Sequence, residues 1–243
     1  MDKKEIARII YKKLKEEGVE SAILSITKVL EAEKTEKLQI TKTPLLNSIG
    51  QELGRLLKKE NWKFEKLKKL WKNGKREERL ITISALGEIG KKEYEAVKEF
   101  VLDIIEDIPD WEICDQLALR VVVNLAKQNK EEMFSIMEKW VLSKNKWIRR
   151  LAVATIPPYI RAIPQDSKRS LTLLENVMKE EDKEVKKAVG WALREVTKKD
   201  PKSVFEFLKK WVKNNDKNTK WIIKDGMKKL TKENQDILKS LLH

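Results

Sequence analysis

The sequence predicts an all-α protein: an α-solenoid of HEAT-like helix pairs that forms a single curved domain over residues 1–243, with a basic concave face. Three observations support this fold class. Only 8 Gly and 6 Pro occur among 243 residues, a composition that favours helices over strands and long irregular loops. A helix-pair pattern recurs along the chain at nearly constant spacing. Lys and Arg number 53 against 39 Asp and Glu, which gives a formal net charge of +14.

The first helices are predicted from apolar periodicity. Residues 3–17 place Ile and Leu at helical spacing before a glycine, and a second apolar segment covers residues 21–32. Thr43 followed by Pro44 is typical of an N-cap and the first helical position, so a third helix is expected over residues 45–59. Two glycines in the sequence GQELG weaken this helix, because each costs roughly 1 kcal/mol relative to Ala.

From about residue 63 the chain repeats one pattern, a helix, a short polar break and a second helix that begins with basic residues. The branched residues Ile113, Ile148, Val185 and Ile222 fall at the same place in successive units. Their spacings are 148 − 113 = 35, 185 − 148 = 37 and 222 − 185 = 37. A helix-pair repeat of this length is typical of a HEAT-like solenoid, whose units bury their apolar faces only by stacking.

The repeat register predicts a column of side chains on one face. Two residues after each branched residue stand Asp115, Arg150, Lys187 and Lys224. Further basic residues occur nearby, namely Arg79, Arg149, Lys186 and Arg194. An acid among basic side chains is unfavourable for general polyanion binding, so Asp115 is a candidate for a specific role. Ordinary solvated helix surface is the alternative for the basic members.

Trp111 and Asp115 lie four residues apart in the stretch DWEICD. Side chains at this spacing share one face of a helix. An indole face beside a carboxylate is a good receptor for a positively charged ligand. The alternative is a packed tryptophan beside a solvated acid.

Composition excludes several kinds of chemistry. Cys114 is the only cysteine and His243 the only histidine. Disulfides, cysteine–histidine zinc sites and the Ser-His-Asp and Cys-His catalytic sites are therefore excluded. No cofactor or metal is predicted, and chemistry must use carboxylates, lysines, tyrosines or tryptophans.

Partner and location follow from charge and hydropathy. A pI near 9.6 indicates a polyanionic partner, because nonspecific nucleic-acid affinity comes from neutralised phosphates. The amphipathic N-terminus carries acids, unlike a signal or transit peptide. No run of about 18 apolar residues occurs, so no membrane span is predicted and a cytoplasmic, reducing compartment is expected. A monomer is the simplest expectation.

Three separated stretches of the sequence are WEICD, NKWIRRLA and KAVGWALRE. Together they resemble motifs of the AlkD-like DNA alkylation repair glycosylases, a family built from HEAT-like repeats. The stretch WEICD matches the family's Trp-x-x-x-Asp with Trp111 and Asp115. The stretch NKWIRRLA matches its Trp-x-x-Arg segment and places the family's arginine at Arg150. The stretch KAVGWALRE matches its Gly-Trp-x-Leu-Arg-Glu block, with Trp191 and Arg194. The resemblance covers roughly residues 3–226.

The resemblance implies a DNA glycosylase of base excision repair that hydrolyses the N-glycosidic bond of N3- or N7-alkylated purines in duplex DNA, without a deep base-flipping pocket. Asp115 would stabilise the oxocarbenium-like sugar and orient water, Trp111 and Trp191 would form the cleft, and Arg150 would hold a phosphate. Predicted DNA-binding residues are Lys42, Thr43, Arg149, Lys186, Lys187, Arg194 and Lys224. The turn after Pro44 departs from the family, because Leu45, Leu46 and Asn47 replace its usual arginines.

Two other functions are compatible with the sequence. One is a HEAT-repeat protein that binds DNA without catalysis, which the altered turn after Pro44 favours. The other is a HEAT scaffold that binds an acidic protein partner, for which the basic column would also serve. The joint presence of Trp111, Asp115, Arg150 and Trp191 favours the glycosylase.

Overall fold

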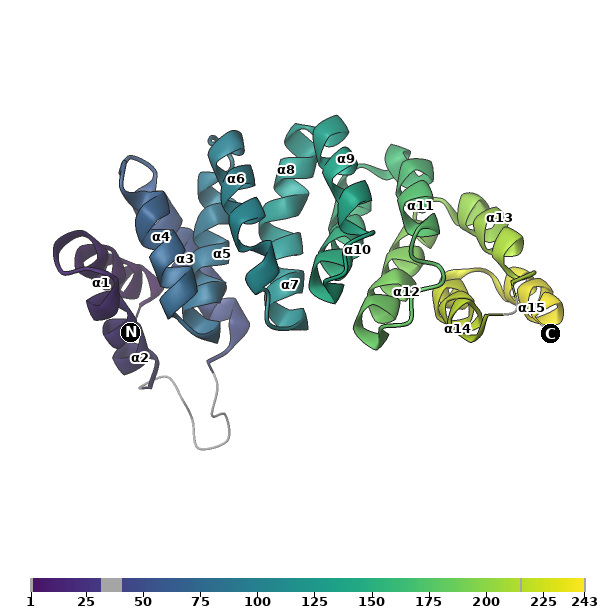
Figure 1. Ribbon diagram of the computed structural model, residues 1–243, viewed down its shortest axis with the longest axis horizontal. Helices are drawn as coiled ribbons and strands as arrows, with labels where there is room; N and C mark the ends of the chain where they lie inside the picture. Colours follow the sequence, from purple (N-terminus) through teal and green to yellow (C-terminus); the bar gives the residue numbers. More distant parts are fainter. Residues whose placement is uncertain (1, 32–40, 215, 243) are drawn as a thin grey trace. The chain divides into compact units, whose positions relative to one another are not determined.

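A computed structural model describes residues 2–31, 41–214 and 216–242, and every regular element in these ranges is helical (Figure 1). The all-α prediction is therefore confirmed. The chain divides into two compact units, Met1–Ile104 and Ile105–His243. The single domain and its basic concave face stay predictions.

The first unit contains six α-helices within the described residues. They are α1 (Lys3–Glu16), α2 (Val19–Glu31), α3 (Thr43–Leu57), α4 (Lys63–Asn73), α5 (Arg76–Ile89) and α6 (Tyr94–Ile104). Gly18 separates α1 from α2 with a φ of 102°, a left-handed conformation that glycine adopts without steric cost. Helix α3 packs between α1 and α5, and α2 and α4 pack against one another and on α5.

The two glycines of α3 are explained by its contact with α5. A Cβ added at Gly50 would collide with the Ile81 carbonyl, and one at Gly54 would lie 2.6 Å from the Ala85 carbonyl. The two helix backbones therefore approach more closely than side chains would allow. This close approach offsets the low helix propensity that the sequence indicated.

The second unit is built from two layers of helices. One layer begins with a continuous helical run formed by α7 (Trp111–Leu117), the π-helical turn η2 (Ala118–Val122) and α8 (Val123–Gln128). The same layer continues with α10 (Lys146–Ala162), α12 (Lys183–Thr197) and α14 (Lys217–Gly226). The other holds α9 (Lys130–Trp140), α11 (Ser167–Glu175), α13 (Pro201–Trp211) and α15 (Lys232–Leu241). Short 3₁₀ turns are η1 (Ile105–Asp107), η3 (Pro164–Asp166) and η4 (Met227–Lys229).

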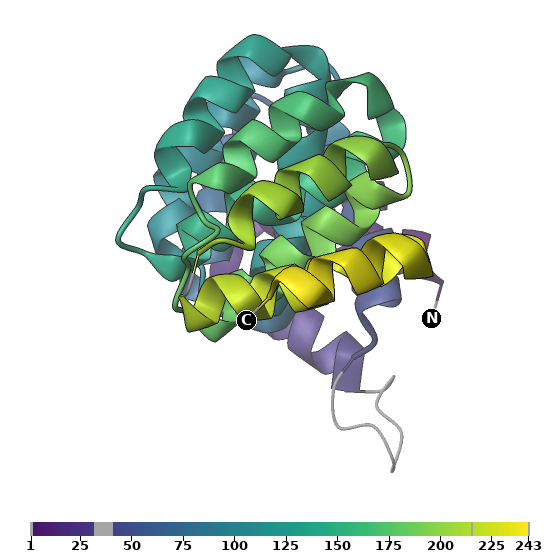
Figure 2. The ribbon, with the colours of Figure 1, turned by 90° about the vertical axis from the view of Figure 1, so that its right-hand side faces the viewer.

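Neighbouring helices of the first of these layers pack in repeat order. Helix α10 lies between α7 and α12 (Figure 1), and α12 also packs on α14. At the C-terminal end of the unit α15 lies beside α13 (Figure 2). The four branched residues of the repeat register, Ile113, Ile148, Val185 and Ile222, lie on α7, α10, α12 and α14 and are at most 3% exposed. Equivalent repeat positions therefore occupy equivalent places in the layer.

Candidate active site

An acidic N-cap fixes the start of α7. Asp110 has an extended backbone, and its Oδ1 accepts hydrogen bonds from the backbone N–H groups of Glu112 (2.9 Å) and Ile113 (3.0 Å). A carboxylate at this position satisfies two otherwise unpaired donors and opposes the positive end of the helix dipole. The cap makes Trp111 the first helical residue, and its side chain is 55% exposed. Asp115 follows one turn later on the same face.

Asp115 is held by Arg150 from the next repeat. Arg150 Nε donates to Asp115 Oδ1 at 2.9 Å, and Nη2 donates to Oδ2 at 2.7 Å. The contact is a bidentate, charge-assisted pair, which is stronger and more directional than a single hydrogen bond. Arg150 is only 6% exposed. The two residues that the repeat register placed in one column therefore contact each other directly.

Arg150 also reaches the third helix of the layer. Its Nη1 donates to the backbone oxygen of Glu184 at 2.5 Å and lies 3.8 Å from Glu184 Oε2. Lys187 then donates from Nζ to Glu184 Oε1 at 2.9 Å. Asp115, Arg150, Glu184 and Lys187 thus alternate in charge across α7, α10 and α12, and we call them the charge ladder.

Burial and pairing act in opposite directions on the two central groups of the ladder. Burial raises the pKa of the Asp115 carboxyl above its ordinary value, and the hydrogen bonds and charge of Arg150 offset part of this rise. The Glu184 charge adds slightly to the rise. Burial is the largest influence on Arg150 and lowers its pKa, but the hydrogen bonds and charge of Asp115, together with smaller effects of Cys114 and Glu184, outweigh it and the pKa is raised. Arg150 is therefore the group that favours an anionic Asp115 in a poorly hydrated position.

Trp191 lies on the ladder side of α12. It follows Glu184 by seven residues, or about two helical turns, so both project from one face. Its indole is half-buried. Trp191 thus lies on the same helix as Glu184, whose backbone oxygen accepts from Arg150, and its role in a cleft with Trp111 stays a prediction.

The glycine before Trp191 has a packing reason. A Cβ added at Gly190 would collide with the Asp225 carboxylate, which contacts Arg194 on one oxygen and Lys228 on the other, the latter at 2.6 Å. Arg194 is thus paired with α14 of the next repeat. The Gly-Trp-x-Leu-Arg block encodes this helix contact as well as the tryptophan.

Two other predicted DNA-binding residues also contact neighbouring repeats. Arg149 donates from Nε and Nη2 to the two oxygens of Glu180, at 2.7 and 2.9 Å, and from Nη1 to the Ser143 carbonyl at 2.8 Å. Lys186 donates to Asn218 Oδ1 at 2.7 Å and lies 5.7 Å from the centre of the Trp221 ring. These contacts join repeats, and the roles of both residues at DNA stay predictions.

The remaining predicted contacts lie at exposed positions or in the other unit. Lys187 and Lys224 are exposed on α12 and α14. In the first unit, Lys42 is exposed directly before α3, and Thr43 Oγ1 accepts a hydrogen bond from Arg76 Nη2 at 3.0 Å.

Cys114 beside Asp115 is not a reactive thiol. Its side chain is fully buried, and its Sγ donates to the Trp147 carbonyl at 3.4 Å. Burial raises the pKa of the thiol well above its ordinary value. A buried neutral thiol is a poor nucleophile, so the chemistry of this site does not use it.

Within residues 2–31, 41–214 and 216–242, no three His, Cys, Asp or Glu side chains are grouped so that they could hold a metal ion. In the same ranges, no helix has the length and apolarity needed to cross a membrane.

Sequence reasoning missed Glu184. The residue stands one position before Val185 in the repeat and three before Lys187. The i,i+3 spacing to a lysine is a weak signal of a local ion pair, and an acid in the first turn of a helix is common. Its contact with Arg150 depends on the packing of α10 on α12 and could not be found from spacing alone.

Comparisons with known proteins agree with this architecture. The sequence model of a family described as "DNA alkylation repair enzyme" matches residues 10–230. Among solved structures, AlkD2 from Streptococcus mutans has 20% identity and a TM-score of 0.54, with 94% of this chain and 98% of that chain covered. The protein smu.31 from Streptococcus mutans UA159 has 18% identity and a TM-score of 0.54, with 95% and 100% covered. At these identities the two structures show a shared helical solenoid fold. A search of curated proteins found no match.

Proposed function

The chain belongs to the DNA alkylation repair enzyme family, and from this premise we propose that it is a monofunctional DNA glycosylase that releases cationic N3- or N7-alkylated purines from duplex DNA. The observation that carries the proposal is the Asp115 carboxylate, whose two oxygens accept hydrogen bonds from Nε and Nη2 of Arg150, with the exposed indole of Trp111 one helical turn before it. A shared fold alone does not imply an activity, so the proposed activity depends on this group of residues.

The proposed substrate explains why so few groups are required. A purine alkylated at N3 or N7 already carries a positive charge and leaves readily, so no general acid is needed to protonate it. The only histidine, His243, is the last residue of the sequence, and this reaction does not require one. Cleavage of the N-glycosidic bond forms an oxocarbenium-like sugar, as in glycoside hydrolysis generally.

Asp115 is the group proposed to act on that cation. A carboxylate in a poorly hydrated position stabilises a developing positive charge more strongly than one in water. The same carboxylate is suited to orient the attacking water. Arg150 supports both roles, because it fixes the carboxylate and favours its anionic form.

Trp111 and Trp191 are proposed to hold the lesion. The exposed Trp111 indole, one turn from Asp115, has a face available for a cationic base or for the sugar. A cation–π contact of this kind contributes about 0.5–2 kcal/mol. Trp191 lies on the ladder side of α12 and is proposed to contact the same nucleotide.

The proposed DNA contacts fall into two groups. Lys187, Lys224 and Lys42 are exposed and are suited to phosphates, which position the duplex without reading its sequence. Arg150 uses three of its five N–H groups for Asp115 and Glu184. We propose that a phosphate beside the lesion takes one of the remaining N–H groups, so that Arg150 contributes mainly through Asp115.

Release of 7-methylguanine or 3-methyladenine from methylated duplex DNA tests the proposal. The wild-type chain is expected to release base, and Asp115→Asn to reduce single-turnover release by about 10²–10⁴-fold. No release by the wild-type chain would refute the glycosylase. Full activity of Asp115→Asn would retain the function and refute the assigned catalytic residue.

A second candidate function is DNA binding without catalysis, favoured by Leu45, Leu46 and Asn47 in place of arginines after Pro44. That protein would bind duplex DNA, methylated or not, with salt-dependent affinity and without release of base. The same assay, combined with a binding titration, distinguishes the two.

A further inference from the structure

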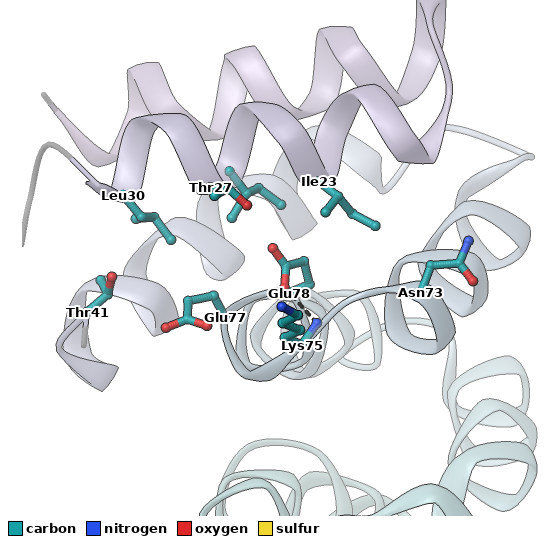
Figure 3. Close-up of a pocket in the computed structure, with 9 residues that line it drawn as sticks. Ile23, Thr27, Leu30, Thr41, Asn73, Lys75, Glu77 and Glu78 are labelled. Atoms are coloured by element: carbon teal, nitrogen blue, oxygen red, sulfur yellow. Dashed lines mark hydrogen bonds between the residues drawn. The ribbon is translucent and has the colours of Figure 1, made fainter. Parts of the chain in front are cut away.

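A pocket in the first unit is lined by none of the residues assigned to catalysis. It has a volume of about 300 Å³, within the range of small-molecule sites. Its lining residues are Ile23, Ile26, Thr27, Leu30, Thr41, Asn73, Lys75, Glu77 and Glu78. Ile23, Thr27 and Leu30 of α2 face Glu77, Glu78 and Lys75 around the start of α5 (Figure 3). We call it the α2–α5 pocket.

One wall of the pocket is apolar and the opposite wall is acidic. The apolar wall consists of Ile23, Ile26 and Leu30, and the acidic wall of Glu77 and Glu78. Both acids stand in the first turn of α5, where they already oppose the positive end of the helix dipole. A bound anion would therefore meet two carboxylates, and this helix start disfavours anionic ligands.

The acidic wall is held rigidly. Glu78 is 4% exposed, and its Oε2 accepts a hydrogen bond from the Lys75 backbone N–H at 2.8 Å. A Cβ added at Gly74 would collide with the Glu78 side chain, so the turn before α5 packs directly on it. Glu77 forms an ion pair with Arg76, whose Nη1 lies 3.3 Å from Glu77 Oε1. Lys75 is exposed, where water and salt screen its charge.

Thr41 supplies a hydroxyl without a partner. Thr41 is one of the residues that line the pocket, the residue is 2% exposed, and no described residue makes a hydrogen bond to its buried Oγ1. Its backbone is fixed, because Arg76 Nη1 donates to the Thr41 carbonyl at 3.0 Å. Buried hydroxyl groups are nearly always hydrogen-bonded. An orphaned hydroxyl beside a rigid carboxylate wall indicates a ligand that brings N–H donors.

We propose that the α2–α5 pocket binds a small amphipathic amine. Its ammonium group donates to the acidic wall and to Thr41 Oγ1, and its hydrocarbon part lies against the apolar wall. The buried Glu78 carboxylate, the half-buried Glu77 carboxylate and the Thr41 hydroxyl are acceptors that match the donors of an ammonium group. The apolar wall adds affinity in proportion to the hydrocarbon area that it covers.

The test titrates the full chain with n-hexylammonium, and with 1-hexanol and hexanoate as matched neutral and anionic probes. Two-dimensional NMR of the ¹⁵N-labelled protein reports both affinity and location. We expect saturable shifts at Thr41 and Glu78 with hexylammonium, with a dissociation constant on the order of 1 mM. Hexanoate is expected to give none. Equal binding of all three probes, or shifts confined to other regions, would overturn the proposal.

Two variants test the chemistry of the site. Glu77→Gln is expected to weaken amine binding by about fivefold, whereas Glu95→Gln, an exposed acid on α6 of the same unit, is expected to leave it unchanged. Thr41→Val removes the orphaned hydroxyl, so it is expected to raise the Tm of the free protein while weakening amine binding. Unchanged affinity in both pocket variants would refute the assignment, and circular dichroism verifies that each is folded.

Discussion

Arg150 binds both carboxylate oxygens of Asp115, at 2.9 and 2.7 Å, across the boundary between two successive repeats. One arginine therefore sets the orientation and the charge of the proposed catalytic carboxylate.

Arg150→Lys is expected to move the acidic limb of the pH–rate profile to higher pH. Lysine keeps the charge but cannot form the bidentate contact, so burial raises the pKa of Asp115 further. Because the reaction requires the carboxylate, activity is then lost at a higher pH as the solution is acidified. The rate at neutral pH is expected to fall about 10²-fold, because the carboxylate is no longer fixed.

Arg149→Lys is the matched control for that variant. Arg149 lies next to Arg150 on α10 and makes an equivalent bidentate contact, with Glu180 in place of Asp115. The acidic limb of the pH–rate profile of Arg149→Lys is expected to coincide with that of the wild-type protein. An identical shift in both variants would show that the effect arises from α10 as a whole and not from Asp115.

Glu184→Gln is expected to move the same limb in the opposite direction. The Glu184 charge raises the pKa of Asp115, so its removal lowers that pKa and extends activity to lower pH. The shift is expected to be small, because the backbone oxygen that accepts from Arg150 remains. Glu181→Gln changes an exposed acid near the start of α12 and should leave the profile unchanged.

Gly190→Ala is expected to lower stability by about 1–3 kcal/mol, a typical cost of overpacking. The added Cβ would collide with the Asp225 carboxylate of the next repeat. Denaturant unfolding of a double-mutant cycle measures this contact directly. In an Asp225→Ala background, Gly190→Ala should lower the free energy of unfolding by less than in the wild-type background. An equal loss of stability in both backgrounds would show that the contact with Asp225 is not its cause.

Lys224→Ala is expected to reduce the salt dependence of DNA binding. Lys224 is exposed on α14, and the loss of one phosphate contact lowers the slope of log K against log salt by about 0.9. Lys139→Ala provides the comparison, because Lys139 is exposed on α9 in the other helix layer of the same unit. Equal slopes for wild type and Lys224→Ala would remove Lys224 from the interface.

The repeat register was predictable because burial enforces it. Ile113, Ile148, Val185 and Ile222 must each enter a helix layer, so their spacing in the sequence places the intervening helices. The contact between Asp115 and Arg150 follows from that register, since equivalent positions in neighbouring repeats are adjacent.

The partners of the basic residues were not predictable in the same way. Arg149, Lys186 and Arg194 each contact an acidic or amide group of the following repeat. These contacts depend on how far each side chain reaches across the helix interface, which periodicity does not specify. The glycines of α3 and α12 are similar, because the close contacts that require them exist only after the helices pack.

The π-helical turn Ala118–Val122 lies directly after the helix that carries Asp115. A π turn accommodates one additional residue in a helical run, and one residue corresponds to about 100° of rotation about the axis. The turn therefore acts as a phase shift. It allows Ile113 and Leu125 both to face the interior while Asp115 keeps its direction toward Arg150. Deletion of one residue here would give a more regular helix. In that helix Ile113 and Leu125 could no longer both face the interior.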